Sequence, residues 1–127
     1  MKDVSCEGER MATYKNLIVW QKSMILIKEI YKLCNNFPEN EIYGLTSQIK
    51  RSAISVPSNI AEGRGRNSKK EFIHFLQIAL GSTYELQTQI EIAKMLNFQG
   101  EYTKIDNLLT EIEKMLNSLI SNRKDNV

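Results

Sequence analysis

The longest helical pattern in the chain is SKKEFIHFLQIALGSTYELQTQIEIAKMLN, residues 68–97. It opens with a capping box, in which the Ser68 side chain accepts a hydrogen bond from the Glu71 backbone N–H and the Glu71 carboxylate reaches back. A stripe then recurs at spacings of three and four, the period of one helix face. Its members are Phe72, Phe75, Leu76, Ala79, Thr83, Leu86, Ile90 and Ala93. A helix of ~30 residues would span roughly 45 Å.

The same period appears in three more segments, residues 15–36, 42–62 and 102–121. The first segment carries two adjacent apolar rows, a width that needs two neighbours: two helices of the same bundle, or one helix and another subunit. One row consists of Leu17, Trp20, Met24, Ile27, Tyr31 and Cys34, and the other of Val19, Leu26, Ile30 and Leu33. In the second segment, Pro57 removes a backbone hydrogen bond, so we expect a kink there.

Four helices with short connections pack most simply as an all-α, up-down-up-down antiparallel four-helix bundle. The chain has 127 residues, which suffices for one hydrophobic core but leaves little for a second domain. We therefore expect residues 15–122 to form the bundle, residues 1–14 a flexible N-terminal extension, and residues 123–127 a frayed tail.

The sequence disfavours membrane insertion and secretion. The longest strongly apolar uncharged run, residues 72–84, has 13 residues, whereas a membrane span needs ~20. The first ten residues lack the apolar region of a signal peptide. We therefore expect a cytoplasmic protein with no membrane partner.

Signatures of catalysis and of cofactor binding are also weak. Cys6 and Cys34 do not form a Cys-x-x-Cys pair, and Cys34 is interpreted as a small buried residue. Neither glycine-rich phosphate-binding motif occurs. Glu71 and His74 have the Glu-x-x-His spacing of di-iron bundles, but such sites need two pairs and further glutamates, so we favour a helix cap and a simple histidine. We expect no enzyme activity, no cofactor, no metal and no small-molecule substrate.

Charge is distributed unevenly along the chain, although the net charge is only +2. Residues 48–70 hold six basic side chains and one acid, a net charge of +5, whereas residues 85–114 carry −3. The six candidate nucleic-acid-binding residues are Arg64, Arg66, Lys69, Lys70, Lys50 and Arg51. Two cations in the first turn of a helix oppose its macrodipole, a cost that phosphate binding beside the glycines would explain. A solvated basic loop is the alternative.

Several motifs are linked in order along residues 17–82: LIVW at 17–20, YGLTSQI at 43–49, RSAISVPSNIAEG at 51–63, Arg66, and a run from Phe72 to Ser82. Together they resemble the S23 family of small bacterial four-helix proteins encoded within intervening sequences of 23S rRNA genes. The chain is similar, too, to the accessory proteins of diversity-generating retroelements.

The resemblance implies a ring-like homopentamer with RNA or another nucleic acid as its partner, and it brings no catalytic residues. It also implies that Pro57 is accommodated within or at the edge of the second helix, and that Asn59 and Glu62 form hydrogen bonds at the junction of the segments. The leading hypothesis is a non-enzymatic, oligomeric RNA-binding protein associated with rRNA. A structural adaptor that binds a protein partner through the same basic surface is the alternative, and a metal-dependent enzyme ranks third.

Overall fold

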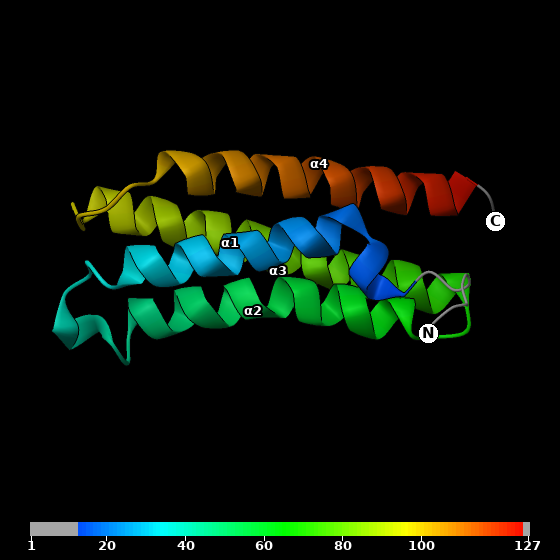
Figure 1. Cartoon of the computed structure of the whole chain (residues 1–127), viewed down its shortest axis with the longest axis horizontal. Helices are drawn as coiled ribbons and strands as arrows, with labels where there is room; N and C mark the ends of the chain where they lie inside the picture. Colours follow the sequence, from blue (N-terminus) through cyan, green and yellow to red (C-terminus); the bar gives the residue numbers. More distant parts are fainter. Residues whose placement is uncertain (1–12, 126–127) are drawn as a thin grey trace.

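The computed structural model describes residues 13–125, with side chains described through Asn122. Four long helices lie side by side and alternate in direction (Figure 1): α1 (Ile18–Cys34), α2 (Leu45–Arg64), α3 (Lys69–Met95) and α4 (Thr103–Asp125). Two short 3-10 helices, η1 (Tyr14–Asn16) and η2 (Glu39–Glu41), precede α1 and α2. No strand occurs in this part of the chain. The expected all-α antiparallel four-helix bundle is confirmed.

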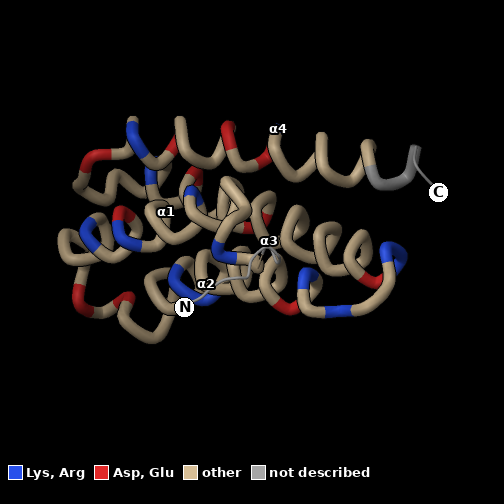
Figure 2. The backbone as a smooth tube through the Cα atoms, turned by 45° about the vertical axis from the view of Figure 1, so that its right-hand side comes forward, with Lys and Arg blue, Asp and Glu red and all other residues tan. Residues whose placement is uncertain are grey.

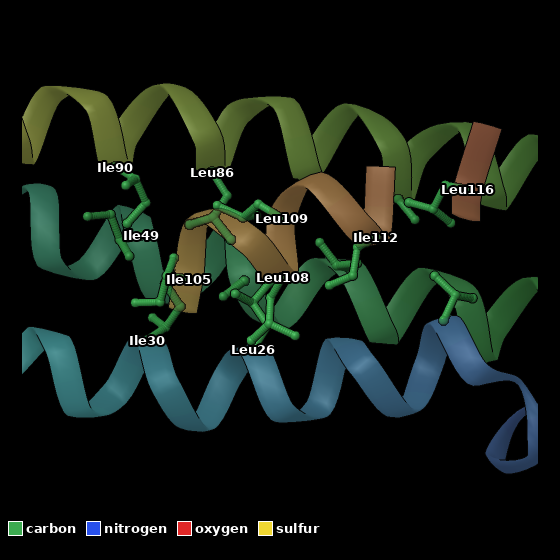
Figure 3. Close-up of a cluster of buried hydrophobic side chains, with 14 of the residues drawn as sticks. Leu26, Ile30, Ile49, Leu86, Ile90, Ile105, Leu108, Leu109, Ile112 and Leu116 are labelled. Carbon is green, nitrogen blue, oxygen red and sulfur yellow. The ribbon is translucent and has the colours of Figure 1, made fainter. Parts of the chain in front are cut away.

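The core lies between the four helices, and each helix contributes one stripe to it (Figure 3). α1 packs against α2 and α4, and α3 packs against the same two helices. The large aliphatic side chains that are shielded most completely are Leu26, Ile30, Ile49, Ile60, Leu76, Leu86, Ile90, Ile105, Leu109, Ile112 and Leu116. Burial of each such side chain contributes about 1.5–3 kcal/mol, so this stripe pattern is what holds the bundle together.

On α1, the core is built from the apolar row that contains Leu26 and Ile30, both fully buried. In the other row, Met24 and Tyr31 are 44% and 41% exposed and Cys34 is buried. Leu17, Trp20 and Ile27 of that row are partly buried against the core. α2 and α4, the helices that contact α1, therefore bury the row of Leu26 and Ile30 and cover the other row in part. Cover of Met24 and Tyr31 by another subunit stays a prediction.

α2 passes through Pro57 without interruption, and the proline ring is buried. Proline lacks the N–H that would bond to the carbonyl four residues earlier. Side chains just after the proline donate to carbonyls in the same region: Ser58 Oγ to Ile54 O and Asn59 Nδ2 to Ser55 O, both at 2.8 Å. These bonds give the carbonyl groups of Ile54 and Ser55 an additional hydrogen-bond donor, in the turn of α2 where the proline removes one backbone hydrogen bond.

A serine pair marks a close crossing of α2 and α3. Ser55 Oγ lies 2.8 Å from Ser82 Oγ, and Asn59 Nδ2 donates to Ser55 Oγ at 3.0 Å. Small side chains let the two backbones approach, and the hydroxyl pair satisfies polar groups that the approach shields from water. The hydrogen bonds of Asn59 therefore lie within the bundle, at Ser55, and not in the turn between α2 and α3.

The turn between α3 and α4 packs against the end of α1. Gly100 has φ of 154°, which a side chain rarely adopts, and an added Cβ there would collide with the Leu33 side chain. Phe98 of the same turn meets Phe37 edge-to-face, with ring centroids 5.1 Å apart. The break between the helices is therefore fixed by tertiary contacts as well as by its glycine.

The expected boundaries at 1–14 and 123–127 fall mostly outside the described residues and stay predictions. Within the described part, Tyr14 already belongs to η1, and α4 continues to Asp125. Of the helices between residues 13 and 125, none is both long enough and apolar enough to span a membrane.

Candidate nucleic-acid interface

Four of the six candidate cations gather at one end of the bundle, where residues 65–68 join α2 to α3 (Figure 2). Arg64 is the last residue of α2, and Lys69 and Lys70 are the first two residues of α3. The Ser68 side chain caps α3 and accepts a hydrogen bond from the Glu71 N–H at 3.1 Å, which confirms this part of the expected capping box. We call residues 64–70 the basic turn.

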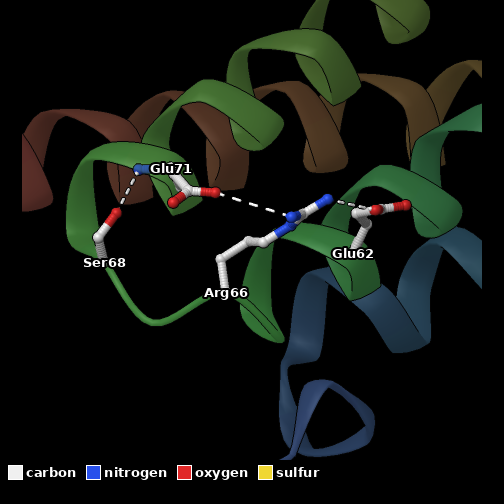
Figure 4. Close-up of polar contacts among 4 residues, drawn as sticks. All are labelled: Glu62, Arg66, Ser68 and Glu71. Carbon is white, nitrogen blue, oxygen red and sulfur yellow. Dashed lines mark hydrogen bonds and ion pairs between the residues drawn. The ribbon is translucent and has the colours of Figure 1, made fainter.

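Arg66 lies between two carboxylates rather than apart from them (Figure 4). One guanidinium nitrogen is 2.6 Å from Glu62 on α2, and the other is 3.8 Å from Glu71 on α3. The guanidinium carbon is also 5.0 Å from the centre of the Phe75 ring. Arg66 therefore links the end of α2 to the start of α3, and the two acids compensate its charge.

A pocket of about 260 Å³ opens beside the basic turn. Its lining residues are Gly63, Arg64, Arg66, Asn67, Ser68, Lys69 and Phe72. Lys70 does not line it, although it neighbours Lys69 in sequence. The pocket thus divides the four cations at this end: three form its wall, and Lys70 lies on the exposed surface of α3.

Lys50 and Arg51 are not part of this cluster. They lie about 20 Å away along α2, at 1.5 Å per residue. The Lys50 Nζ sits 4.5 Å from the centre of the Tyr31 ring on α1, so this cation packs against an aromatic face. Arg51 is exposed and forms no ion pair with the residues that the structure describes.

Two acids of the acidic segment, Asp106 and Glu113 on α4, accept hydrogen bonds from side chains of α3. Lys94 Nζ donates to Asp106 on α4 at 2.7 Å and to Glu91 at 3.0 Å. The hydrogen bond to Asp106 raises the pKa of Lys94, partial burial opposes this shift, and Glu91 adds to it. Glu91 and Asp106 are thus paired with Lys94 near the turn between α3 and α4, at the end opposite the basic turn.

Cys34 and His74 both have surroundings that fit a structural role. Cys34 is buried, as expected, and burial raises the pKa of its thiol even though nearby Lys50 acts in the opposite direction. His74 is exposed, and its ring meets Phe75 edge-to-face at 5.5 Å. Between residues 13 and 125, no three side chains of the kinds that bind metals lie close enough together to hold an ion.

Several residues of this site were not predicted from the sequence. The aromatic contact of Arg66 with Phe75, and the contribution of Asn67 and Phe72 to the pocket, carry no sequence signal. The pairing of Glu62 with Arg66 does carry one: the two residues are four apart, the spacing of neighbours on a helix, and Arg66 lies two residues past the end of α2. The spacing therefore indicates that Arg66 forms an ion pair with Glu62, and it could have distinguished Arg66 from the other cations of the basic turn.

Fold and site together define a small all-α bundle protein with a cationic turn at one end. The chain belongs to the 23S rRNA-intervening sequence protein family, whose model matches residues 15–118. The crystal structure of a protein of unknown function from the S23 ribosomal protein family of Bacteroides thetaiotaomicron is similar, with a TM-score of 0.74 and 30% sequence identity. The match covers 82% of this chain and 96% of that chain. No curated protein matches the chain.

Proposed function

We propose that this chain is a non-enzymatic, homo-oligomeric RNA-binding protein that contacts the phosphate backbone through the basic turn. The observation that carries the proposal is the grouping of Arg64, Lys69 and Lys70 at one end of the bundle. The two acids nearest to them, Glu62 and Glu71, are engaged by Arg66. Residues 62–71 hold four cations and two acids, a net charge of +2, so we expect this end of the bundle to have a positive potential that attracts phosphate.

The family supports RNA as the partner. Its name associates these proteins with intervening sequences of 23S rRNA. No aromatic side chain of the basic turn offers a stacking platform for single-stranded bases, so a structured RNA recognised through its phosphates is the better candidate.

Self-association is the second part of the proposal, and we propose a homopentamer. Tyr31 on α1 contacts Lys50 on α2, and Met24 and Ile54 lie further along these helices, two turns and one turn away. Met24, Tyr31 and Ile54 are 41–44% exposed, and Ile27 is half-buried beside them. A second copy of the chain is the occupant that we assign to this apolar patch. In a ring of five, the patch of each subunit would pack against a different surface of the next subunit, and the same pair of surfaces would recur around the ring.

The test of RNA binding is a mobility-shift titration with a structured RNA hairpin and a DNA duplex of the same length. We expect the affinity for RNA to fall as salt rises, with a slope of about −0.7 to −0.9 in log–log form for each phosphate contacted. Binding that is absent at low salt would contradict the proposal.

The alternative function is a structural adaptor that binds an acidic surface of a protein partner. The same cations would serve it, and the exposed apolar patch is equally available to a protein. The mobility-shift titration separates the two functions, since an adaptor of this kind has no salt-dependent affinity for RNA beyond that of an unrelated protein of equal charge.

A further inference from the structure

Exposed apolar side chains gather at the end of the bundle opposite the basic turn. Ile42 and Tyr43, just before α2, are 52% and 97% exposed, and Met95 and Leu96, at the end of α3, are 71% and 49% exposed. Tyr43 and Met95 are the two most exposed large hydrophobic side chains between residues 13 and 122. Exposed apolar side chains that cluster, unlike single ones, mark interaction sites. We call these four residues the end patch.

The two halves of the end patch lie at the same level of the bundle. α2 and α3 run antiparallel (Figure 1), and Ser55 contacts Ser82 where the two helices cross. Ile42 precedes Ser55 by as many residues as Met95 follows Ser82. The start of α2 and the end of α3 therefore bring both pairs of side chains to one end.

The backbone that carries the end patch is held by contacts within the chain. The ring of Phe37, before α2, meets the ring of Phe98, after α3, at 5.1 Å. Glu41 Oε1 accepts the Leu45 N–H at 3.0 Å, and the Tyr102 hydroxyl donates to Phe98 O at 2.9 Å. The connections that present the patch are thus fixed by packing and hydrogen bonds, so little conformational entropy is lost there when a partner binds.

The charge around the end patch is negative. Residues 29–48 and 91–107, which form this end, hold six acids and three lysines, a net charge of −3. Each of these lysines is paired with acids of the same end: Lys94 with Glu91 and Asp106, and Lys32 and Lys104 with Glu29. The acids of this end that form no ion pair among the described residues are Glu39, Glu41 and Glu101. All three lie in the connections between helices, and Figure 2 shows acidic positions in both connections.

An apolar surface with an acidic border selects the chemistry of its partner. RNA and anionic lipid surfaces carry negative charge, so Glu39 and Glu101 repel them. A protein segment that has lysine or arginine beside apolar side chains complements both features. Its cations meet the acidic border while its apolar side chains cover Tyr43 and Met95.

A second copy of this chain complements the end patch less well. Its basic turn has the opposite charge, but no large hydrophobic side chain between residues 55 and 77 is exposed to pack on Tyr43 and Met95. Its apolar patch on α1 and α2 is already assigned to the contact between subunits. The combination of apolar and acidic groups therefore favours a different protein.

We propose that the end patch binds a basic amphipathic segment of another protein. Tyr43 and Met95 supply the central apolar contacts, and Glu39 and Glu101 supply the acidic border. Tyrosine and methionine are both enriched at protein interfaces. The proposal does not rest on RNA binding, because no residue of the basic turn takes part in it.

The test uses the full-length protein and a fluorescent synthetic peptide, an amphipathic helix of leucine and lysine. One control peptide has the same composition in scrambled order, and the other has glutamate in place of lysine. We expect saturable binding of the first peptide by fluorescence anisotropy, and affinities at least about tenfold weaker for both controls. Amide shifts in NMR should be confined to residues 37–45 and 94–102.

Variants of single exposed residues locate the binding energy. Tyr43→Ala should weaken peptide binding by about tenfold, because a few central side chains carry most of the energy of an interface. Tyr84→Ala is the matched control: Tyr84 is 43% exposed on α3, about three turns before Met95, and its loss should change the affinity less than about twofold. Glu101→Gln should flatten the salt dependence of binding, whereas Glu85→Gln on α3 should leave it unchanged. Thermal melting followed by circular dichroism checks that each variant keeps the helical bundle.

Several results would overturn the proposal. They are the absence of saturable binding, amide shifts centred on the apolar patch of α1 and α2, and equal weakening by Tyr43→Ala and Tyr84→Ala. Shifts of residues 37–45 and 94–102 when the protein is diluted without peptide would assign the end patch to a second copy instead. Loss of hairpin RNA binding leaves the peptide result unaffected, so this proposal and the proposed function fail separately.

Discussion

Gly63 on α2 lies directly against Phe75 on α3, so closely that a Cβ added to the glycine would be 2.5 Å from the Cβ of Phe75. This contact brings the two helices together just before the basic turn. The obstructing atom is the first carbon of the phenylalanine side chain, which cannot rotate away. The position of the pocket therefore depends on the absence of a side chain at residue 63.

Gly63→Ala should destabilise the protein. Overpacking at such a contact costs about 1–3 kcal/mol, and the better helix propensity of alanine returns at most about 1 kcal/mol. We expect a lower free energy of unfolding in urea. Gly81→Ala is the matched control, since Gly81 is also inside a helix but has no atom within 4 Å of its added Cβ. That variant should be more stable by about 0.5–1 kcal/mol, and a stable Gly63→Ala protein would refute the close contact.

Arg66→Gln should lower stability, whereas Lys70→Gln should not. Arg66 loses its ion pairs with Glu62 and Glu71 and its place over Phe75, all partly exposed, so the cost is at most about 1 kcal/mol. Lys70 forms no ion pair with the described residues, and removing a cation from the first turn of α3 relieves the macrodipole by a few tenths of a kcal/mol. Urea denaturation of both variants beside the wild type measures the difference. Equal stability of the two variants would show that the Arg66 pairs contribute nothing.

Ile54→Glu should break the homo-oligomer. Ile54 is 43% exposed in the apolar patch on α1 and α2, and a buried carboxylate without a partner is strongly disfavoured at an interface. Sedimentation should change from an assembly of about 74 kDa to the 14.7 kDa protomer. Ile78→Glu on α3 is the comparison: Ile78 is 38% exposed and outside this patch, so an assembly that survives this change but not Ile54→Glu would assign the effect to the patch. A wild-type protein that sediments as a monomer at micromolar concentration would defeat the prediction.

The protein should lose stability in alkaline solution partly through Lys94. Its hydrogen bond to Asp106 raises the pKa of Lys94 in the folded state. The stabilisation is complete below the ordinary lysine pKa of about 10.4, because both states are then protonated. It is lost as the pH rises through the higher folded value.

Asp106→Asn isolates the contribution of Lys94 to this alkaline loss. Burial also raises the pKa values of Tyr102 and Cys34, and both shifts act in the same direction. These groups remain in the variant, so it should still lose stability above pH 10, but less steeply than the wild type. The measurement is the free energy of unfolding in urea between pH 7 and 11. Parallel curves for the two proteins would rule out the role of the Lys94 pair.

Local signals were enough to predict the four helices and their antiparallel order. The stripe of residues 68–97 repeats at the helical period, Ser68 marks its start, and Pro38 and Gly100 mark breaks between helices. Each of these signals acts over a few residues, so no knowledge of the neighbouring helices is needed. The concentration of Arg64, Lys69 and Lys70 in one turn follows in the same way, since the residues are adjacent along the chain.

Which apolar positions are buried, and which charged side chains are paired, depended on contacts between segments that are distant in the sequence. α1 carries two apolar rows, and the packing of α2 and α4 decides how deeply each position is buried: Leu26 and Ile30 completely, Met24 only in part. Likewise, Arg66 resembles its basic neighbours in sequence, but the approach of α3 brings Glu71 and Phe75 to it. Periodicity specifies which faces a helix has, whereas burial and pairing of charge depend on what packs against each face, which is a property of the assembled bundle.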